Sequence, residues 1–109
     1  MPYTEIPVAE LKIAESDHLI DVREPDEYTA GHVPGAVNIP LSTIVDAVGA
    51  VPVTGTVYVI CQLGGRSARA CEFLSSQPAL SGVTFVNVAG GTAGWSLEGN
   101  EVVGGSSPR

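Results

Sequence analysis

Short apolar runs recur along this chain, and segments with helical residue spacing separate them. The runs show no alternation of apolar and polar residues, which indicates strands buried on both faces. Such strands, alternating with helices, are typical of an α/β fold in which helices cover both sides of a parallel sheet. The expected strands cover residues 18–22, 36–39, 57–61 and 83–88, with a strand end near residue 5, and the expected helices cover residues 42–48, 67–77 and 93–97.

Length and composition predict one globular domain. The chain has 109 residues, of which 44% are hydrophobic and 16% are charged, a balance that supplies a core. We expect a single domain over residues 1–103 and a flexible tail over residues 104–109, where glycine, serine and proline predominate. No apolar stretch is long enough to cross a bilayer, so no membrane partner is expected.

The charge balance argues against nucleic acid as a partner. Twelve acidic residues outnumber five basic ones, for a net charge of −7, and phosphate backbones repel such a surface. Two of the five basic residues, Arg66 and Arg69, nevertheless fall close together just after Cys61. A local positive spot is therefore expected on an acidic molecule.

The chain contains two cysteines, Cys61 and Cys71. Two thiols cannot complete a structural zinc site, and neither histidine stands at ligand spacing from them, so no metal is expected. Free thiols indicate a reducing compartment, and the N-terminus shows no export signal, so we expect a cytoplasmic location.

Cys71 shares a helix face with Ala68 and Leu74 and is expected in the core. His32 is expected to make a structural hydrogen bond.

Cys61 occupies a position that activates thiols. It ends an apolar run and is followed by a loop containing Gly64, Gly65 and Arg66, and then by a helix. A helix N-terminus carries unpaired N–H groups and a partial positive charge, and glycine lets a loop turn its N–H groups inward. Such surroundings lower the pKa of a thiol from about 8.5 to about 7.5 or below. The pattern predicts a cysteine nucleophile beside an anion-binding loop.

Further candidate residues follow from their places near Cys61. We expect Arg66 to bind an anion. Asp21 and Arg23 are expected to form a buried ion pair that supports the active-site loop, with Glu27 either in the same network or exposed. The predicted substrate-binding residues are those directly after the cysteine: Gln62, Leu63, Gly64, Gly65, Arg66 and Ser67.

Three motifs form a recognisable set along the chain. The first comprises residues 19–24 (LIDVRE) and 31–40 (GHVPGAVNIP), the second residues 61–68 (CQLGGRSA), and the third residues 90–95 (GGTAGW). In their order and spacing they resemble the rhodanese family, the single-domain sulfurtransferases. The resemblance implies a five-stranded parallel sheet flanked by helices on both faces.

The resemblance also implies that Cys61 carries sulfur. In such a sulfurtransferase, the thiolate takes a sulfane sulfur from thiosulfate or a persulfide donor and passes it to cyanide, a thiol or a protein, including a sulfur-carrier protein. No metal or organic cofactor is required. Many family members have polar or basic residues directly after the cysteine, whereas this chain has Gln62 and Leu63. Since Leu63 offers no hydrogen-bond donor to a small dianion, the sequence favours a bulkier persulfide donor.

Two other functions stay open. Relatives that share the fold act as phosphatases or arsenate reductases, with a longer loop that holds a tetrahedral oxyanion. Here only four residues separate Cys61 from Arg66, a ring that suits one sulfur better than a phosphate. Other relatives are non-catalytic binding or regulatory modules, which often lack the cysteine that this chain retains. The short loop and the retained cysteine both favour sulfur transfer.

Overall fold

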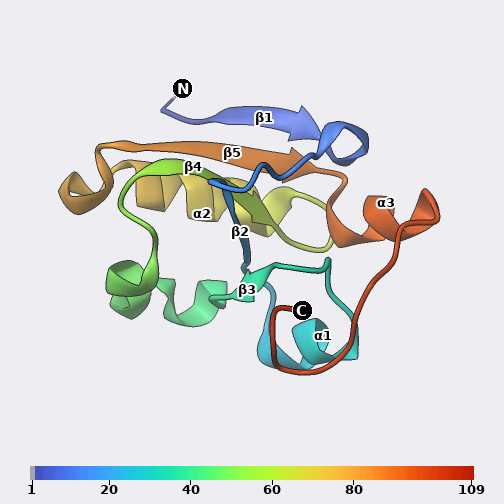
Figure 1. Ribbon diagram of the computed structural model, residues 1–109. Helices are drawn as coiled ribbons and strands as arrows, with labels where there is room; N and C mark the ends of the chain where they lie inside the picture. Colours follow the sequence, from blue (N-terminus) through green and yellow to red (C-terminus); the bar gives the residue numbers. More distant parts are fainter. Residues whose placement is uncertain (1) are drawn as a thin grey trace.

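Five parallel strands form the sheet at the centre of the molecule, which a computed structural model describes for residues 2–109 (Figure 1). The strands are β1 (Thr4–Pro7), β2 (His18–Asp21), β3 (Val37–Asn38), β4 (Gly55–Ile60) and β5 (Val83–Ala89). They lie in the order β1-β5-β4-β2-β3, and each neighbouring pair is parallel. The five-stranded parallel sheet implied by the resemblance is confirmed.

Helices of two kinds connect the strands. The described residues form the α-helices α1 (Pro25–Ala30), α2 (Gly65–Ser75) and α3 (Gly91–Leu97), and the 3-10 helices η1 (Val8–Glu10), η2 (Leu41–Ala50) and η3 (Pro78–Leu80). The helix expected over residues 42–48 is thus longer and has 3-10 geometry, because its β-branched residues and Gly49 disfavour the α-helix. Within residues 2–109, no helix has the length and apolar character needed to span a membrane.

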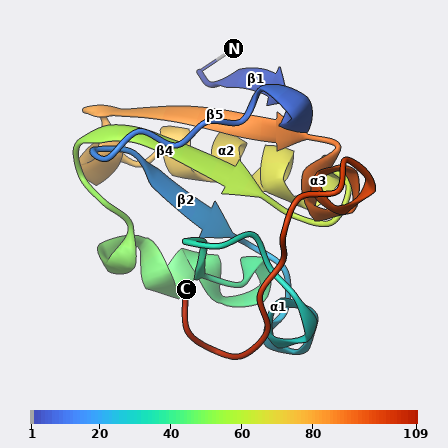
Figure 2. The ribbon, with the colours of Figure 1, turned by 45° about the vertical axis from the view of Figure 1, so that its right-hand side comes forward.

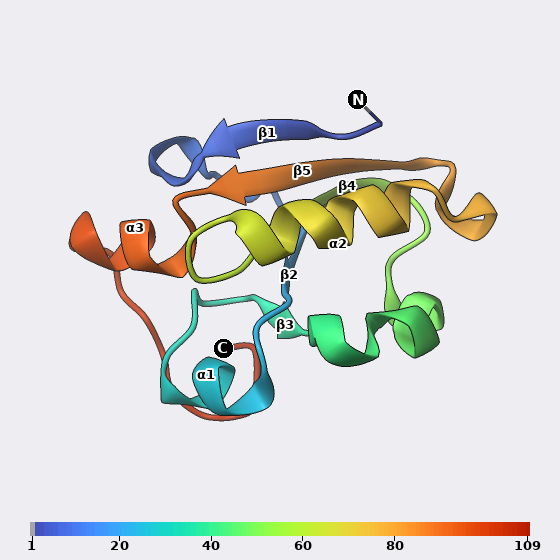
Figure 3. The ribbon, with the colours of Figure 1, turned by 180° about the vertical axis from the view of Figure 1, so that it is seen from behind.

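Two hydrophobic cores lie on opposite faces of the sheet, because successive side chains of a strand point to opposite faces. Along and just after β4, Val57, Val59 and Cys61 belong to the core that includes residues of α2 and η2. Ile60 belongs to the second core, with residues of α1 and η1. Figure 3 shows α2 lying along one face of the sheet. The expected cover of helices on both faces is confirmed.

The carboxyl ends of β2, β4 and β5 point toward one edge of the sheet, where the loop before α2 lies beside α3 (Figure 2). Asp21 and Ala89 end β2 and β5, and Cys61 directly follows β4. Ligands of parallel α/β sheets bind beyond this edge. The topology therefore brings the three sequence motifs to one place.

The C-terminal residues run beside α1 (Figure 1). The Gly105 N–H donates to the Thr29 carbonyl at 2.9 Å, and the Gly35 N–H donates to the Pro108 carbonyl. These bonds place the tail in the structure, while the flexibility of residues 104–109 and the extent of the domain stay predictions.

Candidate active site

Cys61 lies directly beyond β4, at the start of the loop that leads into α2. The residue is only 1% exposed. The Gly64 N–H donates to Cys61 Sγ at 3.0 Å, and Ser67 Oγ lies 3.2 Å from Sγ and 3.2 Å from the Gly64 carbonyl oxygen. The loop surrounds the sulfur with hydrogen-bond donors, as its glycines and the helix start predicted.

These contacts set the charge state of the two thiols differently. Burial raises the pKa of Cys61, but hydrogen bonds from the Ser67 side chain and from the backbone of Ser67, Gly64 and Leu63 lower it, and the net pKa lies below the usual value. For Cys71, burial raises the pKa to about 12, with a further rise from nearby Cys61. The predicted core position of Cys71 is confirmed.

The carbonyl groups of residues 61–63 are all anchored on residues 90–93. Thr92 donates its backbone N–H and its hydroxyl to the Cys61 carbonyl at 2.9 and 3.0 Å. The other two bonds run from the Gly90 N–H to the Leu63 carbonyl at 3.0 Å and from the Ala93 N–H to the Gln62 carbonyl at 3.1 Å. Because C=O and N–H point oppositely across a trans peptide, these anchors leave the loop's N–H groups free to face the sulfur.

Two glycines permit this contact between the loop and α3. Gly64 has φ +120° and Gly91 has φ +58°, values that side-chain-bearing residues rarely adopt. A Cβ on Gly91 would lie 2.5 Å from the carbonyl oxygens of both Cys61 and Gln62, which are backbone atoms with no freedom to move aside. The third sequence motif therefore shapes the loop of the second.

The predicted ion pair between Asp21 and Arg23 is present and buried. Arg23 Nη2 lies 2.9 Å from Asp21 Oδ2, and Nε lies 3.1 Å from Oδ1. Arg23 also donates from Nη1 to Gln62 Oε1 at 3.2 Å and from Nη2 to the Gly31 carbonyl at 2.7 Å. Arg23 thus links this ion pair to Gln62 in the loop after Cys61, while its role in supporting an active site stays a prediction.

Arg66 forms an ion pair with Glu27, which the sequence interpretation did not foresee. Arg66 Nη1 and Nη2 donate to Glu27 Oε1 and Oε2 at 2.7 and 2.9 Å. The sequence placed Glu27 with Asp21 and Arg23 or in solvent; the first turn of α1 directs its carboxylate, which is 35% exposed, to Arg66 at the start of α2. The side-chain hydrogen bond from Arg66 lowers the pKa of Glu27 to about 2, and Arg23 also lowers this pKa. Anion binding by Arg66 stays a prediction, and its charge is shared with Glu27.

A cavity of about 380 Å³ opens at the loop, lined by Cys61, Gln62, Leu63, Gly65, Arg66 and Arg69. Leu63 is 73% exposed, and Arg69 forms no ion pair with any of residues 2–109. Gly64 and Ser67, the other two predicted substrate-binding residues, contact the sulfur and do not line this cavity. All the predicted loop residues thus lie around the thiol: the Gly64 N–H and Ser67 Oγ contact Sγ, and a backbone hydrogen bond from Leu63 also lowers its pKa.

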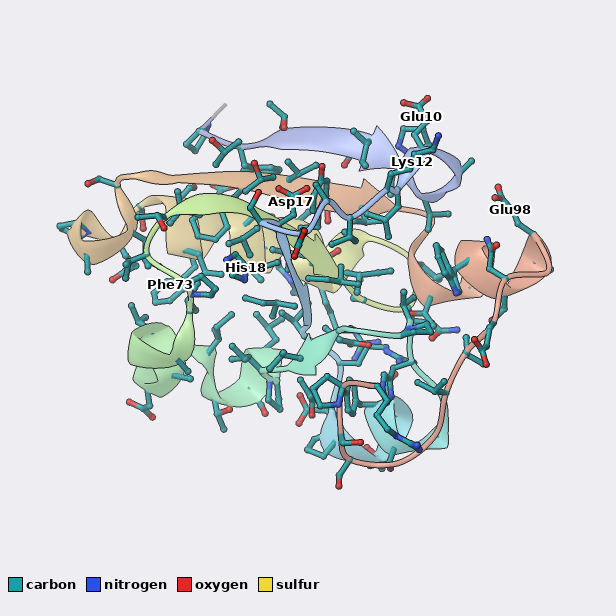
Figure 4. All side chains as sticks on the ribbon, viewed as in Figure 1. Glu10, Lys12, Asp17, His18, Phe73 and Glu98 are labelled. Carbon is teal, nitrogen blue, oxygen red and sulfur yellow. The ribbon has the colours of Figure 1, made fainter. Side chains whose placement is uncertain are left out.

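A second cavity, of about 210 Å³, lies elsewhere, beside the start of β2. Most of its lining is apolar, with Asp17 and His18 as its charged and titratable members. Figure 4 labels both residues, and His18 begins β2, whereas Asp21 ends the strand at the carboxyl edge. This cavity takes no part in the candidate site.

Sequence reasoning assigned no role to two residues that hold the loop. Thr92 donates twice to the Cys61 carbonyl. Asn87 is 1% exposed in β5, and its Nδ2 donates to the Gly64 carbonyl at 3.2 Å. Asn87 could have been found from the sequence as an amide within an apolar strand. Thr92 could have been found from its place in the third motif.

Metal ligation finds no support among residues 2–109, where no group of three or more His, Cys, Asp or Glu side chains could hold an ion. The chemistry of the site, as far as the described residues form it, is that of a thiol among hydrogen-bond donors, with a pKa below its usual value. The expectation that neither a metal nor an organic cofactor is required stays a prediction.

Most of the chain, residues 7–98, matches the family described as "Rhodanese-like domain". The chain belongs to the rhodanese-like family. This rhodanese-like chain is 42% identical over 86 residues to the thiosulfate sulfurtransferase PspE of Escherichia coli, covering 77% of this chain and 79% of PspE. It is 35% identical over 102 residues to the putative sulfurtransferase YtwF of Bacillus subtilis, covering 90% of this chain and 95% of YtwF.

Solved structures agree with this rhodanese-like assignment. A rhodanese-related protein from Thermoplasma volcanium superposes with a TM-score of 0.78 at 36% identity, covering 93% of this chain and 98% of that one. Some relatives are longer, since this chain spans 59% of YqhL of Bacillus subtilis and 23% of the adenylyltransferase and sulfurtransferase uba4 of Ogataea parapolymorpha. The predicted family and fold are confirmed.

Replacing Gly91 by alanine tests the contact between the loop and α3. The new Cβ would meet two backbone carbonyl oxygens at 2.5 Å, so the segments must separate. We expect the free energy of unfolding to fall by more than about 2 kcal/mol and the alkylation of Cys61 by iodoacetamide to slow. Gly65→Ala is the control, because a Cβ there meets nothing within 4 Å. Equal urea unfolding curves for the two variants would contradict the assignment.

Replacing Glu27 by glutamine tests the ion pair with Arg66. The folded-state pKa of Glu27 is about 2, below its ordinary value of 4.5, so the pair stabilises the fold above pH 4.5 and this contribution is lost as the pH falls toward 2. We therefore expect the difference in unfolding free energy between wild type and Glu27→Gln to shrink through that window. Urea unfolding at several pH values measures it, with exposed Asp26→Asn as the control. A difference that does not depend on pH would count against the pair.

Proposed function

We propose that this rhodanese-like chain is a sulfurtransferase that carries a sulfane sulfur on Cys61. The set of donors around Cys61 Sγ carries the proposal, with the Gly64 N–H at 3.0 Å and Ser67 Oγ at 3.2 Å. These groups stabilise a thiolate as the attacking group, and they suit the negative charge of a persulfide in the same place. The relatives named as sulfurtransferases support the same reaction.

In the first half of the proposed reaction, the Cys61 thiolate attacks the outer sulfur of the donor. With thiosulfate, a bond forms between Cys61 and that sulfur, the S–S bond of thiosulfate breaks, and its electron pair leaves with sulfite. The product is a Cys61 persulfide whose outer sulfur is negatively charged. The loop N–H groups stabilise this charge as they would an oxyanion.

In the second half, a nucleophilic acceptor attacks the outer sulfur of the persulfide. The bond to Cys61 breaks, and its electron pair returns to the Cys61 thiolate. Cyanide would leave as thiocyanate, and a thiol or a sulfur-carrier protein would leave as a persulfide or an equivalent sulfur adduct. Both thiols of the chain are free, which supports our proposal of a reducing compartment, the cytoplasm.

Cys61 loading is the first test of this function. After incubation with thiosulfate, intact-protein mass spectrometry should detect a gain of one sulfur atom on wild type and none on Cys61→Ser, with cyanide releasing the sulfur as thiocyanate. Cys71→Ser is the matched control and should load normally, because Cys71 lies in the core.

If neither thiosulfate nor glutathione persulfide transferred sulfur to Cys61, the result would contradict sulfur transfer and favour a binding module. Hydrolysis of an aryl phosphate that depends on Cys61 would instead favour the phosphatase alternative.

The cavity walls favour a bulky donor over thiosulfate. Leu63 is 73% exposed and offers no hydrogen bond, while Arg66 shares its charge with Glu27. Arg69 remains as the cation without a partner among the described residues. A small dianion thus meets one unshared charge and an apolar wall, whereas an organic persulfide can cover Leu63.

We therefore expect kcat/KM for glutathione persulfide to exceed that for thiosulfate. Leu63→Lys adds a cation to the cavity and should move the ratio toward thiosulfate, because the dianion gains an opposite charge. Steady-state kinetics with both donors measures the ratio. A clear preference of wild type for thiosulfate would contradict the hypothesis.

A further inference from the structure

Asn87 is a buried amide between apolar neighbours in β5. Its residue is 1% exposed, and Val86 and Val88 beside it are buried as well. Within residues 2–109, Asn87 Oδ1 and His32 Nε2 are the buried side-chain nitrogen or oxygen atoms that lack a hydrogen-bond partner. An unpartnered buried acceptor destabilises a fold, so an apolar side chain of similar size should stabilise this position better.

The orientation of the Asn87 amide follows from its two contacts. Nδ2 lies 2.8 Å from Glu5 Oε1 and 3.2 Å from the Gly64 carbonyl oxygen. A backbone carbonyl accepts hydrogen bonds only, and so does an ionised carboxylate, so the atom facing both must be the amide nitrogen. Glu5 stands opposite Asn87 in the pairing of β1 with β5, which run side by side in Figure 1.

Gly64 links Asn87 to the thiol. Its carbonyl accepts from Asn87 Nδ2, and its N–H donates to Cys61 Sγ at 3.0 Å. The peptide before Gly64 is anchored because the Leu63 carbonyl accepts from the Gly90 N–H at 3.0 Å. Gly64 has φ +120°, and its carbonyl, in the peptide after it, accepts from Ser67 Oγ and from the Ala68 N–H in the first turn of α2, each at 3.2 Å. Asn87 supplies the contact to this carbonyl that comes from the sheet.

We propose that Asn87 is a positioning residue, held by Glu5, that fixes Gly64 in the conformation in which its N–H donates to Cys61 Sγ. The inference rests on the proposed role of Cys61 as the reacting thiol. Through Glu5 and Asn87, the edge strand β1 would act on the site indirectly, since Glu5 contacts neither the cavity nor the sulfur. The unpartnered Oδ1 is the consequence of turning the amide nitrogen toward Gly64.

Asn87→Val gives a result that a merely structural role would not produce. The variant removes the unpartnered oxygen and places a strand-favouring side chain in a buried strand, so we expect a melting temperature no lower than that of wild type. It also removes the contact that ties the Gly64 carbonyl to the sheet, while the bonds from Ser67 and Ala68 remain, so we expect the pKa of Cys61 to rise by about one unit. Below that pKa, alkylation by iodoacetamide should be about tenfold slower, since only the thiolate reacts.

Three further variants sharpen the comparison. Asn87→Thr has nearly the volume of asparagine but a hydroxyl too short to reach Gly64, so it should raise the pKa of Cys61 as Asn87→Val does. Glu5→Gln keeps an acceptor for Asn87 and should not raise that pKa. Thr84→Val changes a residue of the same strand that makes no contact with the loop, and it should leave the alkylation profile unchanged.

The measurements are the pH profile of Cys61 alkylation and the melting temperature of each variant. A folded Asn87→Val or Asn87→Thr with an unchanged profile would overturn the proposal, and so would loss of folding in both. An equal shift in Thr84→Val would also overturn it. Alkylation needs no sulfur donor, so failure of sulfur loading would remove the proposed function and leave the result for Asn87 standing.

Discussion

The backbone hydrogen bonds between residues 61–63 and residues 90–93 are the constraint on which the site depends. They exist because β4 and β5 are neighbours in the sheet, with Val59 opposite Asn87, so the loops that follow the two strands emerge side by side. A loop that must direct several N–H groups at one atom has to place its carbonyls elsewhere. The N–H groups at the turn into α3 bind these carbonyls. The electrostatic environment of Cys61 therefore depends on two chain segments that are distant in the sequence.

Two ion pairs tie the region after β2 to the same loop, and they differ in what they do. The pair of Asp21 and Arg23 is buried, a setting in which desolvation cancels much of the attraction, so its value lies in orienting Gln62. The pair of Glu27 and Arg66 is partly exposed, and it reduces the positive charge beside the cavity. On a chain of net charge −7, this leaves Arg69 as the unshared cation near the thiol.

The sequence predicted those features that neighbouring residues determine. Apolar runs such as residues 57–61 identified the strands, because burial on both faces excludes polar alternation, and Gly64, Gly65 and Arg66 indicated which thiol is the candidate nucleophile. The partner of Glu27 was not predictable in this way, since Arg66 lies 39 residues further along the chain and only the sheet order brings them together. The function of Asn87 was hidden for the same reason.

The depth of Cys61 has a consequence for selectivity in the proposed cycle. Cys61 is 1% exposed and lines the cavity at the loop. A transferred sulfur atom would extend the side chain by about 2 Å, the length of an S–S bond. An incoming nucleophile therefore encounters the cargo atom before the cysteine itself, which directs the collision toward release and away from a dead-end mixed disulfide. Burial of Cys61 thus favours attack on the transferred sulfur over attack on the cysteine sulfur.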